Sequence, residues 1–142
     1  MLISSILRHK GGAVVTVPPQ ATVTDLLALL SERNIGAVVV SEDGDTIAGI
    51  VSERDIVRHL HQTGPSVLDH HVSTIMTGSV RTCGPDANVD DLRRTMTDHR
   101  IRHVPVIDEG RLAGIVSIGD VVKSAIEELE AEKAHLVGYL HG

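Results

Sequence analysis

The sequence contains two copies of one pattern, and this internal repeat constrains the fold more than any other feature. The five residues 48–52, Ala-Gly-Ile-Val-Ser, recur letter for letter at 113–117, and the segment 21–26 resembles the segment 87–92. Each copy has about 60 residues, which is small for an independent hydrophobic core. Because a repeated unit that cannot bury its own apolar face packs on its neighbour, the two copies are expected to pack together.

The order of predicted elements is the same in both copies. Short β-branched runs bounded by Pro and Gly predict strands, whereas apolar residues at helical spacing after a Ser or Thr cap predict helices. In the first copy they are a strand at 14–17, a helix at 22–33, strands at 36–40 and 46–51, and a helix at 52–62. In the second copy they include a helix at 89–100 and strands at 103–107 and 112–116. The predicted fold class is α+β, with two β-α-β-β-α units.

Four regions follow from this order. The first copy with its N-terminal segment covers 1–63, a linker covers 64–71, the second copy covers 72–125 and a helical extension covers 126–142. The tail has a helical apolar spacing with glutamates around it. Its apolar positions are Val122, Ile126, Leu129, Leu136 and Leu140. This helix is predicted either to fold onto its own domain or to pack on a second copy of the chain.

A serine and an aspartate three residues apart follow Gly-Ile-Val in each copy, as Ser52 and Asp55 and as Ser117 and Asp120. One interpretation is a capping box, in which the serine accepts a backbone N–H and the aspartate reaches back to the cap. The other is a ligand site. A helix N-terminus suits a phosphate, and a carboxylate there can accept both hydroxyls of a ribose. Spacing alone does not choose between the two.

In both copies, the Gly-Ile-Val-Ser-x-x-Asp block follows a helix that starts Val-x-x-Leu and a turn that reads Ile-x-x-Val. This order of blocks, found twice, resembles a tandem CBS-domain pair, also called a Bateman module. The resemblance covers residues 3–125. It implies a pseudo-twofold pair with two clefts between the repeats, which often bind AMP, ADP, ATP, NAD or S-adenosylmethionine. It also implies a ribose-binding role for Asp55 and Asp120, with Ser52 and Ser117 near the phosphate, and regulatory sensing rather than catalysis.

By the same resemblance, each cleft takes residues from both copies. One cleft is expected to combine Ala21, Ile35 and Gly36 with Ser117 and Asp120. The other is expected to combine Ala87, Ile101 and Arg102 with Ser52, Arg54 and Asp55. The two isoleucines are expected to clamp an adenine face, to be core residues at the turn from helix to strand, or to do both.

The copies differ in one sequence that bears on these clefts. The first copy reads Asn34-Ile35-Gly36-Ala37, whereas the second reads Arg100-Ile101-Arg102-His103. In a chain of net charge −6, a local cluster of cationic groups indicates an anion site. Arg102 and His103 are therefore predicted to bind phosphate, with room left by Gly36 and Ala37, and the two clefts are expected to be unequal. Arg100 equally suits the dipole of the helix that it ends.

Composition and motifs exclude several other classes of protein. A net charge of −6 with one Tyr, no Phe and no Trp is unsuited to phosphate and base contacts with nucleic acid. The single cysteine, Cys83, allows no internal disulfide, and the nine histidines show no metal-ligand spacing. There is no nucleophile elbow, no Walker loop and no apolar run of the roughly 18 residues that span a membrane.

The sequence therefore predicts a cytoplasmic, non-catalytic regulator that binds an adenine nucleotide and no metal. AMP is the leading ligand, with NAD, ADP and ATP as alternatives. A homodimer is expected from the family resemblance, and an unidentified regulated protein is the expected partner. The alternative is a structural or protein-interaction module without a ligand, in which the Ser–Asp pairs only cap helices.

Overall fold

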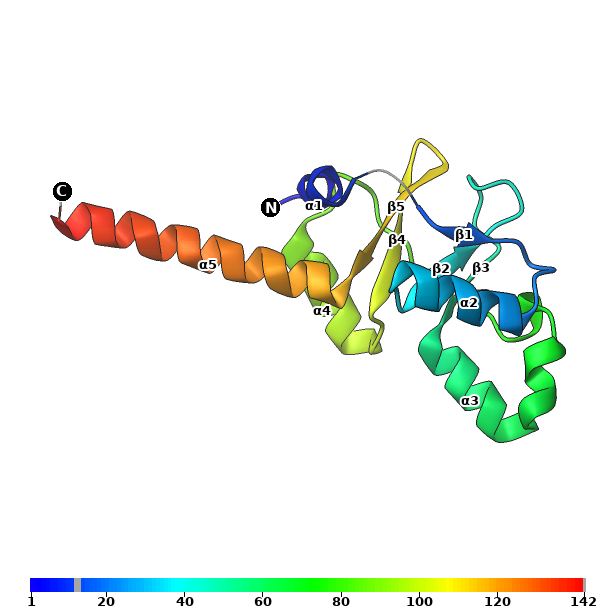
Figure 1. Cartoon of the computed structure of the whole chain (residues 1–142). Coiled ribbons are helices and arrows are strands. Elements are labelled where there is room, and N and C mark those ends of the chain that lie inside the picture. Colours follow the sequence, from blue (N-terminus) through cyan, green and yellow to red (C-terminus); the bar gives the residue numbers. More distant parts are fainter. Residues whose placement is uncertain (12–13, 142) are drawn as a thin grey trace.

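The computed structural model of the chain describes residues 1–11 and 14–141 and combines helices with short strands (Figure 1). The helices are α1 (Ile3–Lys10), α2 (Val23–Arg33), α3 (Glu53–Thr63), α4 (Val89–His99) and α5 (Ile118–His141). The strands are β1 (Thr16–Val17), β2 (Ala37–Val40), β3 (Gly49–Ser52), β4 (His103–Asp108) and β5 (Arg111–Ser117). Two 3₁₀ turns, Pro65–Asp69 and Val72–Thr74, connect the copies. The predicted α+β class is confirmed.

The first copy forms a three-stranded sheet in the order β1-β2-β3. β1 is parallel to β2, and β3 is antiparallel to it, with Val38 opposite Val51. The return strand begins at Gly49 rather than at the predicted Thr46, because Thr46 closes a turn in which its N–H donates to Asp43 Oδ1 at 2.8 Å. Hydrogen bonds from the backbone of this turn hold the pKa of the Asp43 carboxyl below its ordinary value.

The first strand of each copy is shorter than predicted. β1 has two residues, and its counterpart in the second copy is a single parallel bridge between Cys83 and Val106, beside the antiparallel pair β4–β5. The chain turns soon afterwards in both copies, where Ala21 N donates to Pro18 O and Ala87 N donates to Gly84 O. These turns end the pairing before a longer strand can form.

The N-terminal segment of each copy packs in the hydrophobic core of the other copy, and we call these two segments the exchanged segments. Ile3 of α1 is buried in the core of the second copy, and Val72, at the start of the second copy, is buried in the core of the first. Matching hydrogen bonds run from Ile3 N to Ala87 O at 2.9 Å and from Val72 N to Ala21 O at 2.7 Å. Because each core needs a segment from the other copy, the two copies are expected to unfold together.

Two glycines at equivalent positions allow this exchange. A Cβ on Gly49 would lie 2.6 Å from Met76 Sδ, and a Cβ on Gly114 would lie 2.5 Å from Leu7 Cδ2. At Gly49 such a Cβ would also lie 2.8 Å from the backbone oxygen of Thr77, so the close approach of this segment depends on glycine, whereas at Gly114 only the Leu7 side chain would have to move.

α5 continues beyond the second copy and projects away from the rest of the molecule (Figure 1). Near its start, Val121 and Ser124 are buried. The other large apolar side chains from Val122 onward are exposed. They are Val122, Ile126, Leu129, Leu136, Val137, Tyr139 and Leu140. The predicted long C-terminal helix is confirmed, and the described residues leave most of its apolar face uncovered.

Candidate functional site

A cavity of about 440 Å³ lies between the two copies, where the start of α3 faces the start of β4; we call it the α3 cleft. The first copy contributes the first turn of α3. The second copy contributes residues 99–103 and, from its N-terminal segment, residues 77 and 79–81. Six of the residues expected in one cleft or at its edge lie together here. They are Ser52, Arg54, Asp55, Ile101, Arg102 and His103.

Ser52 and Asp55 form a capping box at the first turn of α3. Ser52 N donates to Asp55 Oδ2 at 2.9 Å, and Asp55 N donates to Ser52 Oγ at 3.4 Å. The interpretation of the pair as a helix cap is therefore correct. It does not conflict with a ligand role, because the cap uses Oδ2, whereas Oδ1 lies 3.9 Å from Arg58 Nη1, beyond hydrogen-bond distance.

The α3 cleft is strongly cationic. Five arginines line it: Arg54, Arg58, Arg81, Arg100 and Arg102. Within the described part of the chain, Arg58 is the only one of the five with an acidic partner closer than 4.0 Å. Two carboxylates, from Glu53 and Asp55, face these five guanidinium groups. A positive cleft in a chain of net charge −6 is the arrangement expected for an anionic ligand.

His103 begins β4 and is half-buried. Burial lowers the pKa of its imidazole, and the positive charges of Lys10 and Arg102 lower it further, against the attraction of Asp120 and Glu53. This shift disfavours the charged form of the imidazole. The five arginines are therefore the main source of positive charge in the α3 cleft.

The start of α5 repeats the geometry of α3, and we call the region beside it the α5 cleft. Ser117 N donates to Asp120 Oδ2 at 2.8 Å, and Asp120 N donates to Ser117 Oγ at 3.2 Å. Here α1 occupies the adjoining space. Lys10 Nζ donates to Asp120 Oδ2 and to Ile115 O, both at 2.8 Å. Two small cavities of about 210 and 130 Å³ remain, and Lys10 lines both.

Lys10 also lowers the pKa of the Asp120 carboxyl. Burial of the Asp120 carboxyl favours its neutral form, but hydrogen bonds from Lys10 and from the backbone of Ser117 outweigh burial, so the pKa lies below its ordinary value. The α5 cleft thus contains an ion pair at the place where the α3 cleft is open. The two clefts differ, although their Ser–Asp pairs are the same.

Gly36, which the sequence predicts beside Ser117 and Asp120, lines the α3 cleft. Glu53 N donates to Gly36 O at 3.0 Å, which holds the chain before β2 against the first turn of α3. A Cβ on Gly36 would lie 2.7 Å from Glu53 Oε1, so the end of the Glu53 side chain would have to move to make room for it. The next residue, Ala37, lines both clefts.

Ala21 and Ala87 are placed against the cores rather than along the cavities described above. Each packs on the core of its own copy, and its carbonyl accepts the hydrogen bond from the exchanged segment. Ile35 and Ile101 occupy both kinds of position. Ile35 packs on the first core and lines the smaller cavity of the α5 cleft, and Ile101 packs on the second core and lines the α3 cleft.

The cleft residues absent from the sequence prediction include Arg58, Arg81 and Lys10. Arg58 has a local signal, because it follows Arg54 by four residues and so lies on the same face of α3. Arg81 and Lys10 have no such signal. They reach their clefts from distant segments, and Lys10 is 105 residues from the Ile115 carbonyl that it contacts.

Within residues 1–11 and 14–141, no group of three or more His, Cys, Asp or Glu side chains is arranged to hold a metal ion. In the same residues, no helix combines the length and the apolar character that crossing a membrane requires. Cys83 is half-buried, and burial raises the pKa of its thiol.

Comparison with known proteins gives consistent matches. The family model for the CBS domain matches residues 4–62 and 72–127. The chain is 36% identical over 148 residues to the CBS domain-containing protein CBSX3, mitochondrial, of Arabidopsis thaliana, covering 99% of this chain and 72% of that protein.

Solved structures agree with this match. The CBS-domain containing protein ATU1752 from Agrobacterium tumefaciens has a TM-score of 0.85 and 42% identity, covering 88% of this chain and 99% of that one. The CBS domain pair of protein MJ0100 has a TM-score of 0.79 and 25% identity, covering 90% of this chain and 98% of that one. That structure is a complex with 5′-methylthioadenosine and S-adenosyl-L-methionine.

Proposed function

The chain belongs to the CBS-domain family, whose stand-alone members are regulatory modules, and on this premise we propose that it senses an adenine nucleotide in the α3 cleft without catalysing a reaction. AMP is the ligand proposed first, with NAD, ADP and ATP as alternatives. One observation carries the proposal: a single cavity of about 440 Å³ contains both the Asp55 carboxylate and five arginines.

Each part of AMP has a matching group in the α3 cleft. The Asp55 carboxylate has lone pairs left for the two ribose hydroxyls, since the cap uses only Oδ2. The guanidinium groups of Arg54 and Arg102 suit a phosphate. Ile101 offers apolar surface to the adenine. Together these groups favour a nucleotide over a nucleoside.

The ligands of the MJ0100 domain pair support the adenosine part of this proposal. 5′-Methylthioadenosine and S-adenosyl-L-methionine share adenosine with AMP but carry no phosphate. The arginines of the α3 cleft are the reason for proposing a phosphorylated ligand here, because charge-assisted hydrogen bonds to phosphate are among the strongest that a protein makes.

We expect AMP to stabilise the folded chain. A ligand bound only by the native state adds about 2.7 kcal/mol at a hundredfold excess over its dissociation constant, which corresponds to a rise in melting temperature of about 5–10 °C for a domain of this size. Differential scanning fluorimetry with AMP, ADP, ATP, NAD and S-adenosylmethionine at equal concentration measures this rise. If none of the five changes the melting temperature, the interaction module without a ligand becomes the better interpretation.

We further propose a two-fold homodimer in which α5 helices of two chains pack together. The helix carries a row of apolar side chains at spacings of three and four residues, interrupted once by Lys133. The row consists of Val122, Ile126, Leu129, Lys133, Leu136 and Leu140. Such spacing is typical of a coiled-coil seam, and exposed apolar rows of this length mark interaction sites.

The row has the same spacing in both directions about residue 131, so it can pair with itself in the antiparallel sense. In that register Lys133 of each chain lies over Leu129 of the other. Its alkyl stem covers the leucine, while its ammonium reaches the carboxylates that flank the seam at Glu130 and Glu132. A second copy of the chain therefore fits this face in both shape and charge.

Leu129→Asp is expected to convert the dimer into a monomer, because it places a carboxylate in the centre of the apolar seam. The matched control is Ala131→Asp, which adds the same charge on the opposite side of the helix and is expected to leave the dimer intact. Light scattering coupled to size-exclusion chromatography gives the mass of each protein. A monomeric wild-type chain, or a Leu129→Asp variant as dimeric as the wild type, contradicts this assembly.

The proposed output of the module is a change in shape or in affinity for a regulated protein. Because the α3 cleft takes residues from both copies, a ligand bound there would contact both and would favour one arrangement of them. Action in the cytoplasm stays a prediction; the Arabidopsis thaliana relative bears the description mitochondrial.

A further inference from the structure

The two clefts are built from equivalent residues, yet the space beside them differs. The offset of 65 residues that relates Gly49 to Gly114 also relates Ser52 and Asp55 to Ser117 and Asp120. Both Ser–Asp pairs make the same two hydrogen bonds. One cavity of about 440 Å³ lies beside the first pair, whereas beside the second pair the described residues leave smaller cavities of about 210 and 130 Å³, both lined by Lys10.

The difference comes from the N-terminal segment of each copy. Beside the α3 cleft, the N-terminal segment of the second copy is extended at Thr77, whose N donates to Ile50 O at 2.8 Å. The equivalent carbonyl beside the α5 cleft, Ile115 O, accepts from the side chain of Lys10 instead. α1 stays helical as far as Lys10, so its backbone N–H groups are used within the helix, and the side chain makes the contact.

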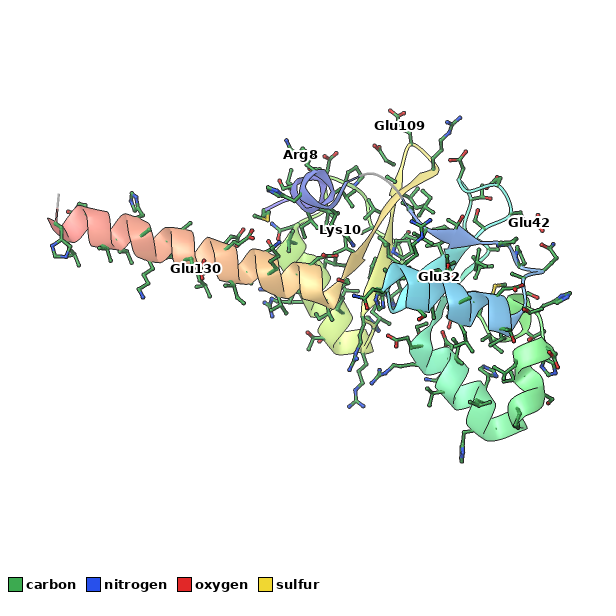
Figure 2. All side chains as sticks on the ribbon, in the orientation of Figure 1. Arg8, Lys10, Glu32, Glu42, Glu109 and Glu130 are labelled. Carbon is green, nitrogen blue, oxygen red and sulfur yellow. The ribbon has the colours of Figure 1, made fainter. Side chains whose placement is uncertain are left out.

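Lys10 pairs with the carboxylate that a ribose in this cleft would contact. Its ammonium lies 2.8 Å from Asp120 Oδ2, the oxygen that also accepts from Ser117 N, and the Asp120 side chain is only 20% exposed. Figure 2 shows Lys10 on the side of α1 that faces β5, with Arg8 on the other side. One turn earlier in α1, Leu7 lies directly over Gly114 and fills the space above β5.

We propose that Lys10 is a built-in occupant of the α5 cleft: its ammonium neutralises the Asp120 carboxylate and its side chain lies in the space beside it, so the chain has one open adenosine site instead of two. This inference rests on the proposed function of the α3 cleft. A ligand that enters the α5 cleft must first separate a charge-assisted hydrogen bond at a partly buried carboxylate. Its apparent affinity is reduced by the small fraction of molecules in which Lys10 has moved away.

Equilibrium dialysis with 5′-methylthioadenosine tests this occupancy. This probe has a ribose but no phosphate, so its binding in the α5 cleft depends on Asp120 rather than on arginines. We expect Lys10→Met to bind one more molecule of probe per chain than the wild type, because methionine keeps the length of the side chain and removes the ammonium. Lys10→Gln is a second variant with the same expected gain, and each variant's melting temperature without ligand shows whether it is folded.

Two controls separate the contact from a general effect of lost charge. Arg8→Met removes a cation from the opposite side of α1 and is expected to gain no site. Asp120→Asn added to Lys10→Met is expected to lose the gained site, because the carboxylate that holds the ribose is gone. Asp120→Asn alone is expected to leave the number of bound probe molecules per chain at the wild-type value.

The outcomes distinguish this inference from the proposed function. If the wild type binds AMP but folded Lys10→Met and Lys10→Gln gain no site, or if the wild type already binds two molecules of probe, Lys10 does not occupy a ligand site and the proposed function stands. If neither AMP nor the probe binds to the wild type or to the variants, the proposed function fails, and the inference fails with it.

Discussion

Replacing Asp55 by asparagine is expected to weaken AMP binding by about 10- to 100-fold, the change that follows from losing about 1.5–3 kcal/mol of charge-assisted hydrogen bonding. The amide oxygen of asparagine can still accept from Ser52 N, which now donates to Asp55 at 2.9 Å, so the helix cap is largely preserved. The ribose hydroxyls lose a charged acceptor. Isothermal titration calorimetry with AMP measures the difference.

The chain offers a matched control for this experiment. Asp25 forms the same capping box with Thr22 at the start of α2, with both hydrogen bonds at 3.1 Å, but it is exposed and lines neither cleft. Asp25→Asn therefore repeats the loss of a capping carboxylate without touching the site. If the two variants bind AMP equally well, Asp55 is a helix cap only, and the proposed ribose contact is wrong.

The second large effect is expected from Gly49→Ala, which should lower the free energy of unfolding by about 1–3 kcal/mol, a cost typical of overpacking. The new Cβ would lie 2.6 Å from Met76 Sδ and 2.8 Å from Thr77 O. Met76 can move its side chain, but Thr77 cannot retreat easily. Its backbone exchanges hydrogen bonds with Ile50 at 2.8 and 3.0 Å. Relief of the clash therefore disrupts the exchanged segment.

Gly114→Ala is the matched substitution in the other copy. There the new Cβ meets only the side chain of Leu7, at 2.5 Å for the nearest carbon, and this side chain can rotate. We expect a smaller loss of stability than for Gly49→Ala. Urea unfolding of the wild type and the two variants gives the three free energies of unfolding. A larger loss for Gly114→Ala than for Gly49→Ala would mean that the Thr77 backbone beside Gly49 yields more easily than the Leu7 side chain beside Gly114.

Local interactions explain how much of this fold the sequence predicts. The capping boxes at Ser52 and Ser117 and the helix end at Gly64 each involve groups within four residues of one another. The bounds of α2, α3 and α4 therefore agree closely with prediction. The strand bounds agree less well, because Thr46 and the turns after Cys83 give their hydrogen bonds to neighbouring groups instead of to a strand.

The sequence by itself determined the two-copy order of elements, the Ser–Asp pairs that begin α3 and α5, and the long amphipathic helix at the end of the chain. Only the tertiary structure decided that the N-terminal segments of the copies exchange cores, that Arg81 joins the α3 cleft, and that Lys10 occupies the α5 cleft. The reason is the separation along the sequence between the groups that interact. A cap depends on atoms a few residues apart, whereas Lys10 and Asp120 are 110 residues apart and meet only because α1 packs on β5.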